Sequence, residues 1–159
     1  MNVYLLNYLN KNQIPLGLGY IASMLKKNDV YVDIIDNISL IPKNLECIVG
    51  LPTFLPYFKD IVLKTEKIKK RNPSAIIILG GHLATIAHNE ILQDFKTIDI
   101  IVKGEGEYTM LNIVNCFKKN NSLKNVPGIS YRNKDEIVIN NDFQVISEQQ
   151  LNTLPCIIF

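Results

Sequence analysis

Two apolar segments that run into glycine place the strongest constraint on the fold of this chain. Ala75–Leu79 passes directly into Gly80-Gly81, and Ile98–Val102 is followed closely by the segment Gly104–Glu107. Short, wholly apolar runs are typical of strands that are covered on both faces. Glycine at a strand end lets the chain turn sharply or lets a ligand approach the backbone. Because parallel sheets bind ligands beyond the carboxyl ends of their strands, both segments are predicted to lie on one ligand-facing rim.

Apolar strand-like segments alternate with amphipathic helical segments along most of the chain. The predicted strands are Asn2–Leu6, Val30–Ile35, Cys47–Leu51, Ala75–Leu79 and Ile98–Val102. The predicted helices are one that follows Pro15, then Tyr57–Lys70, Ile86–Phe95 and Tyr108–Lys118. This alternation predicts an α/β, Rossmann-like (flavodoxin-like) fold, with a five-stranded parallel sheet in the order 2-1-3-4-5 and helices on both faces. A C-terminal β-hairpin, Val126–Arg132 with Glu136–Asn140, is expected to dock on the sheet edge because an isolated hairpin is marginal in water.

Charge and composition exclude several classes of partner. The 159 residues carry seventeen basic and fifteen acidic side chains, a net charge of +2, and these are mixed along the chain. Such a balance lacks the electrostatic footprint of a nucleic-acid-binding protein. No apolar run approaches the roughly 20 residues of a membrane span, and the chain opens directly on strand residues. We therefore expect a cytoplasmic protein with neither nucleic acid nor membrane as a partner.

The residues that could carry catalysis or bind metal have simpler structural explanations. The three cysteines are far apart in the sequence, and His82 and His88 are six residues apart, a spacing that does not place them on one helix face. Glu105 and Glu107 have the chemistry of a general acid–base pair. Carboxylates are also favourable in the first turn of a helix, at the positive end of the helix dipole, and this is the simpler explanation. The sequence thus predicts no catalytic residue and no metal site.

A dinucleotide fingerprint is an alternative interpretation of the N-terminal region. Gly17–Ala22 matches the GxGxxA pattern, and Asp36 follows the second predicted strand. In that fingerprint the first glycine follows the strand almost at once, whereas here the segment from Asn7 to Leu16 intervenes. A nicotinamide-dependent oxidoreductase domain is kept as a third hypothesis.

Five ordered segments resemble the N-terminal cobalamin-binding domain of cobalamin-dependent radical S-adenosylmethionine enzymes. They are Ile14–Ala22, Ile78–Thr85, Asp99–Glu107, Val126–Arg132 and Leu151–Pro155. The resemblance implies that cobalamin lies across the carboxyl-end rim of a Rossmann-like sheet. It assigns the corrin border to Leu16, Gly17, Leu18 and Gly19, the surface under the corrin to Thr53 and Phe54, and the border of the nucleotide tail to Gly80, Gly81, His82, Gly104, Glu105, Gly106 and Glu107.

The resemblance also implies how the chain is divided. Residues 1–122 would form the Rossmann-like domain, residues 123–141 its hairpin extension, and residues 142–159 a linker toward a radical S-adenosylmethionine domain of the same full-length protein. That domain would hold S-adenosylmethionine and an iron–sulfur cluster on a cysteine triad. No CxxxCxxC occurs in these 159 residues, so this chain by itself is not expected to perform the radical step.

Two departures from the family pattern affect the ligand. His82 stands where the family usually has proline and Leu83 where it has histidine, and Pro52 replaces a small hydroxyl residue. No Asp-x-His-x-x-Gly occurs, so cobalamin is expected base-off, with no histidine of the protein on its cobalt. The altered segments also leave a second hypothesis open, a cofactor-free Rossmann-like scaffold or interaction domain.

Overall fold

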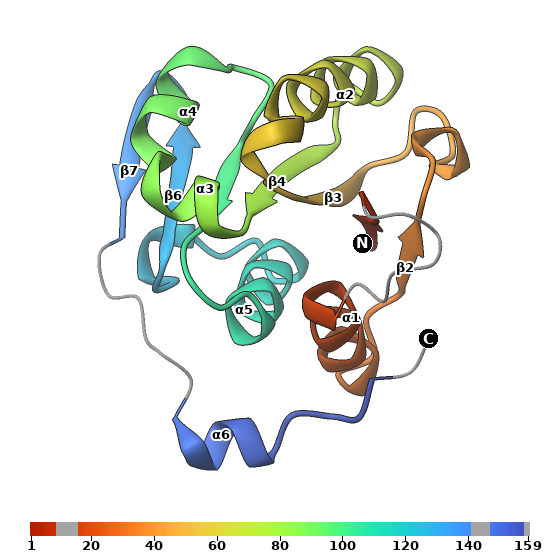
Figure 1. The fold of residues 1–159 in the computed structure, drawn as a ribbon, viewed down its shortest axis with the longest axis vertical. Coiled ribbons are helices and arrows are strands. Elements are labelled where there is room, and N and C mark those ends of the chain that lie inside the picture. The colour runs from red at the N-terminus through yellow and green to blue at the C-terminus, as the bar shows by residue number, and fades with distance from the viewer. Residues whose placement is uncertain (9–15, 141–146, 158–159) are drawn as a thin grey trace.

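The structure is a computed structural model that describes residues 1–8, 16–140 and 147–157. The described residues form one sheet in the order β2-β1-β3-β4-β5-β6-β7 (Figure 1). Its strands are β1 Asn2–Leu6, β2 Val32–Ile35, β3 Cys47–Pro52, β4 Ile76–Gly80, β5 Ile100–Val102, β6 Ile129–Asn133 and β7 Glu136–Ile139.

The first five strands are parallel and have the predicted order 2-1-3-4-5. The hairpin docks on the edge of this sheet, as expected, and its pairing with β5 makes a single sheet of seven strands where five were predicted. β6 pairs antiparallel with β5, and Val102 lies opposite Ile129. The Asn140 side chain holds the hairpin in place by donating to the carbonyl oxygens of Leu123 and Val126, at 2.9 and 2.8 Å.

The helices cover both faces of the sheet, as predicted. α1 (Leu16–Lys27) and α5 (Glu107–Lys118) pack together on one face, while α2 (Phe58–Arg71), α3 (His82–Ile86) and α4 (His88–Asp94) cover the other (Figure 1). A further short helix, α6 (Glu148–Asn152), lies within the segment predicted as a linker. Three short 3-10 helices, at Ile38–Leu40, Leu55–Tyr57 and Leu123–Asn125, complete the described elements.

The helix predicted over Ile86–Phe95 corresponds to α4, His88–Asp94, but the prediction missed α3, a short helix that precedes it. The two helices meet at Ala87, and α3 begins immediately after Gly81. Alternating apolar positions do not reveal such a break, because Ala87 is compatible with a continuous helix.

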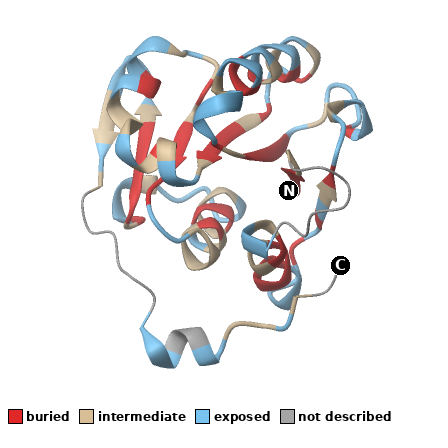
Figure 2. Cartoon of the chain, in the orientation of Figure 1, coloured by how far each residue is buried: buried red, intermediate tan, exposed pale blue. Residues whose placement is uncertain are grey.

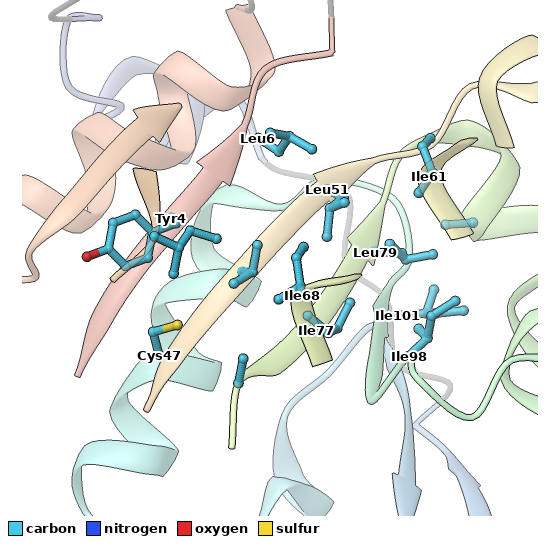
Figure 3. Close-up of a cluster of buried hydrophobic side chains, with 14 of the residues drawn as sticks. Tyr4, Leu6, Cys47, Leu51, Ile61, Ile68, Ile77, Leu79, Ile98 and Ile101 are labelled. Atoms are coloured by element: carbon cyan, nitrogen blue, oxygen red, sulfur yellow. The ribbon is translucent and has the colours of Figure 1, made fainter. Parts of the chain in front are cut away.

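Two apolar clusters fill the space between the sheet and its helices (Figure 2). Alternate strand residues point to opposite faces. The cluster in Figure 3 joins Leu51, Leu79 and Ile101 of the sheet to Ile61 and Ile68 of α2. The opposite cluster joins other strand residues to the buried sides of α1 and α5. In the described part of the chain, no helix combines the length and apolar character needed to cross a membrane.

Candidate functional site

A pocket of about 320 Å³ opens at the carboxyl ends of β1, β3, β4 and β5, next to α1 and α5. It contains the point where the chain order reverses, since β1 is followed by β2 on one side and β3 leads to β4 on the other. Open α/β sheets bind their ligands at such a switch point. The described lining residues are Leu5, Asn7, Tyr8, Leu16, Gly17, Leu18, Ile21, Gly50, Leu51, Pro52, Phe54, Ile78, Leu79, Gly80, Gly81, Val102, Gly104, Glu105, Gly106, Glu107 and Met110.

Glycine has a distinct role at two positions of this rim. Gly81 has a φ of +99°, and a Cβ there would lie 3.3 Å from both the backbone nitrogen and the carbonyl oxygen of Thr53. At Gly106, a Cβ would lie 2.9 Å from Cδ1 of Ile21 on α1. The first glycine therefore permits a backbone turn. The second permits close packing between the start of α5 and α1.

Two threonine hydroxyls hold the strand ends in position. The Thr53 hydroxyl donates to the Gly80 carbonyl oxygen at 2.8 Å and accepts from the Ala84 N–H at 3.0 Å. The Thr85 hydroxyl donates to the Gly81 carbonyl oxygen at 3.0 Å and accepts from the Gly104 N–H at 3.0 Å. The two glycine segments predicted from the sequence are thus joined by the Thr85 side chain of α3, while Thr53 ties Gly80 to the same helix.

One edge of the pocket is apolar and aromatic. Leu16 and Phe54 line it and are 57% and 40% exposed, far more than apolar side chains in the core of the protein. Tyr8 stands beside them, with its ring centroid 5.8 Å from that of Tyr57. Exposed apolar side chains that are grouped in this way are typical of a surface that binds a ligand or a partner.

Hydrogen bonds hold the Tyr8 ring at this edge. The Tyr8 hydroxyl donates to a carboxylate oxygen of Asp60 and accepts from the Lys64 ammonium group at 2.9 Å. The ammonium nitrogen also lies 4.6 Å from the centroid of the Tyr8 ring. Burial and the hydrogen bond to Asp60 raise the pKa of Tyr8, so its phenol is neutral near pH 7.

Two carboxylates, Glu105 and Glu107, also line the pocket. Glu107 is the first residue of α5, and its Oε2 atom is buried with no hydrogen-bond partner among the described residues. Burial raises the pKa of Glu107, and the nearby charge of Glu105 raises it further. Backbone N–H groups at the start of α5 act in the opposite direction. Glu107 is therefore a partly buried side chain that lines the pocket and has one acceptor atom without a donor in the described residues.

Most of the residues predicted for the site line this pocket, and three do not. Gly19 is buried within α1, Thr53 is buried with its hydroxyl turned toward Gly80 and Ala84, and His82 is exposed at the start of α3. Their predicted roles toward a cofactor stay predictions. The beginning of the first motif, Ile14-Pro15, lies outside the described residues.

Neither histidine lines the pocket described above. Nδ1 of His88 lies 2.9 Å from the Ser130 hydroxyl, on the side of the sheet covered by α4. Burial and the charge of Lys103 lower the pKa of His88, so the ring is neutral near pH 7. Within the described ranges, no three His, Cys, Asp or Glu side chains group as metal ligands.

The dinucleotide interpretation lacks its required geometry. Gly17 and Gly19 lie inside α1, and nine residues separate the end of β1 at Leu6 from the start of that helix at Leu16. A dinucleotide fingerprint needs its first glycine in a tight turn directly after the strand. These glycines instead belong to a helix that borders the pocket.

Sequence reasoning missed the floor of the pocket, which includes Gly50, Ile78, Val102 and Met110. These residues come from three strands and α5, so no local pattern unites them. One signal was present, because Gly50 interrupts the otherwise bulky apolar run of β3. A glycine inside a strand often marks a close approach of another group.

Comparison with known protein families gives one match. Residues 4–114 match the B12 binding domain family, a range that contains the pocket rim and the strands beneath it.

Three known proteins illustrate the similarity. The chain is 29% identical over 133 residues to an uncharacterized methyltransferase of Pyrococcus horikoshii, covering 77% of this chain and 29% of the relative. It is 28% identical over 138 residues to an anaerobic magnesium-protoporphyrin IX monomethyl ester cyclase of Cereibacter sphaeroides, covering 78% and 22%. The structure of the cobalamin-dependent S-adenosylmethionine radical enzyme OxsB, with aqua-cobalamin and S-adenosylmethionine bound, superposes with a TM-score of 0.69 at 24% identity, covering 91% and 22%. The chain thus spans less than a third of the length of these relatives.

Proposed function

This chain belongs to the B12-binding domain family, and from that premise we propose that it holds cobalamin across the pocket at the carboxyl-end rim of its sheet. The family match and the ordered motifs agree on this ligand. The observation that carries the proposal is the open pocket itself, which is bordered by Gly80, Gly81, Gly104 and Gly106 and has an exposed apolar edge. A large, flat and partly apolar ring needs an open surface of this kind, because glycine has no side chain that would block its approach.

The pocket volume supports partial rather than complete enclosure. About 320 Å³ is at the lower end of the range for small-molecule sites, which runs from about 300 to 1,000 Å³. A macrocycle would therefore rest on the rim, with Phe54 and Leu16 against its face, and insert only a peripheral part into the pocket.

The ligand is proposed to bind base-off, without a protein histidine on cobalt. His82 and His88 are the only histidines of the chain, and neither lines the pocket. His88 is in addition engaged with Ser130. These observations support a bound cobalamin whose cobalt has no protein histidine ligand and whose lower face contacts apolar side chains or water.

Radical chemistry is assigned to a further domain of the same full-length protein, which would hold S-adenosylmethionine and an iron–sulfur cluster. The similarity to OxsB supports this assignment, because that radical enzyme binds aqua-cobalamin and S-adenosylmethionine together and this chain covers only 22% of its length. In this division, residues 1–122 and the hairpin at 123–141 hold the cofactor, and residues 142–159 connect to the further domain. The role of this chain is then to bind and orient cobalamin for a reaction carried out next to it.

Titration with hydroxocobalamin and methylcobalamin, followed by visible spectroscopy, tests the proposal. We expect one-to-one binding and a spectrum in which the dimethylbenzimidazole ligand has left the cobalt. Gly80→Leu should weaken binding at least tenfold, because a Cβ at Gly80 meets no atom within 4 Å and the added side chain would occupy the site without disturbing the fold. Ser74→Leu, exposed at the opposite end of β4, is the matched control.

Failure of both corrinoids to bind the folded wild-type chain would overturn the proposal and support the cofactor-free scaffold instead. Equal affinity of the wild type and Gly80→Leu would move the site away from this rim. A spectrum that retains the dimethylbenzimidazole ligand would refute base-off binding alone.

A further inference from the structure

The charges that the described residues place on the pocket wall are all of one sign. Among the described lining residues, Glu105 and Glu107 are the charged side chains, and no lysine or arginine accompanies them. The other described walls are apolar or glycine, apart from Asn7 and Tyr8. A ligand that enters this pocket therefore meets anions on the α5 side and meets no described cation that could balance a negative charge of its own.

Glu107 has an acceptor that the described protein residues leave unused. Its Oε2 atom is buried and has no donor within the described residues, although the side chain belongs to a pocket that is open to a ligand. A buried carboxylate oxygen without a donor is unfavourable, because its lost hydration is not replaced by a hydrogen bond. Burial also raises the pKa of this group, as expected where solvent cannot hydrate the carboxylate. A donor supplied by the ligand would remove this penalty.

We propose that Glu107 accepts a hydrogen bond from a primary amide at the edge of the corrin ring, and that it thereby selects amidated corrinoids over those with free carboxylates. This inference rests on the proposed function. The corrin periphery of cobalamin carries primary amide groups, whose N–H bonds are suitable donors to Oε2. The hydrogen bond would be charge-assisted, a class roughly twice as strong as a bond between neutral groups.

The same geometry would reject a corrinoid acid. Hydrolysis of the contacting amide replaces an N–H donor by a carboxylate, which would face Glu107 with Glu105 nearby. Two carboxylates in direct contact cannot both remain ionised without a penalty, and partial burial of Glu107 increases it. Sites built to bond a donor discriminate strongly against analogues that lack it, because their polar group is left unpaired.

The test compares hydroxocobalamin with its three monocarboxylic acids, each of which has one peripheral amide hydrolysed. Affinities would be measured at pH 7.5 for the wild type, for Glu107→Gln and for Glu90→Gln. Glu90 lies exposed in the first turn of α4, outside the pocket, and provides the matched control. The readout is the affinity for hydroxocobalamin divided by the affinity for each monocarboxylic acid. A general effect of the substitution on folding would not change this ratio.

We expect at least one monocarboxylic acid to bind the wild type and Glu90→Gln ten or more times more weakly than hydroxocobalamin. In Glu107→Gln that ratio should fall below about three, because glutamine is neutral and can donate to a carboxylate. Equal binding of all the acids to the wild type would overturn the inference, as would an unchanged ratio in Glu107→Gln. Absence of hydroxocobalamin binding would instead overturn the proposed function, and the inference with it.

Discussion

The Thr53 hydroxyl donates a hydrogen bond to the carbonyl oxygen of Gly80, 2.8 Å away, and so joins the ends of β3 and β4 at the pocket rim. The Thr53 backbone N–H donates to the same oxygen, also at 2.8 Å. The hydroxyl additionally accepts from the N–H of Ala84 in α3. The sequence resemblance assigns Thr53 to the surface under the ligand. In the structure, its hydroxyl is hydrogen-bonded to the backbone of Gly80 and Ala84.

Replacement of Thr53 by valine should destabilise the fold. Valine keeps the shape of the side chain but leaves the N–H of Ala84 without its acceptor in a buried place, which is unfavourable by about 1–3 kcal/mol. Urea unfolding should show a lower midpoint with an unchanged slope. The control is Thr109→Val in α5, where the hydroxyl makes a long contact of 3.4 Å to the Glu105 carbonyl oxygen. Equal midpoints for the two variants would refute the supporting role of Thr53.

Alanine should be unfavourable at Gly81 but tolerated at its neighbour Gly80. Gly81 has a φ of +99° and would place a Cβ 3.3 Å from two backbone atoms of Thr53, so Gly81→Ala should lose about 1–3 kcal/mol of unfolding free energy. Gly80→Ala meets nothing within 4 Å and should change stability by no more than about 0.5 kcal/mol. Thermal or urea unfolding measures both. A similar loss in the two neighbours would show that the left-handed backbone at Gly81 is not the cause.

The contribution of Glu107 to stability should depend on pH. Burial raises the pKa of this group in the folded chain, so the folded chain binds its proton more tightly than the unfolded chain does. Between the unfolded and the folded pKa, stability must fall as pH rises, and the loss then persists at neutral pH. Glu107→Gln should therefore have a higher melting temperature than the wild type at pH 7.

That difference should vanish near pH 3, below the ordinary pKa of glutamate of about 4.3. Calorimetry at the two pH values, with Glu90→Gln as the control, tests the prediction. A difference of the same size at both pH values would contradict it, because it would then not arise from ionisation of Glu107.

The cysteines should differ sharply in reactivity. Cys47 is fully buried in β3, and burial raises the pKa of its thiol to about 11. At pH 8 only about one molecule in a thousand would carry the thiolate, the reactive form. Cys156 is exposed. Labelling of the native chain by a thiol reagent, mapped by mass spectrometry, should reach Cys156 promptly and Cys47 only after unfolding. Comparable rates at the two sites would show that the sheet opens locally at β3.

Sequence patterns predicted the fold well because its elements depend on local regularities. The apolar runs of β3 and β4 were recognisable in isolation, and so was the buried side of α2 formed by Ile61, Val62, Thr65 and Ile68. Short connections and right-handed crossovers then left few strand orders. The sequence patterns did not predict α3, a helix of five residues that packs against β4, β5 and α4.

For the site, the sequence by itself determined that glycine-lined strand ends converge on one rim, because parallel strands bring their carboxyl ends to the same edge. Only the tertiary structure decided which groups face the ligand. It turns Thr53 inward to Gly80, brings Met110 of α5 close to Gly50 of β3, and leaves Oε2 of Glu107 buried beside the pocket. The physical reason is that strand and helix patterns arise from neighbours in the chain. The direction and burial of a side chain are set by packing between residues far apart in it.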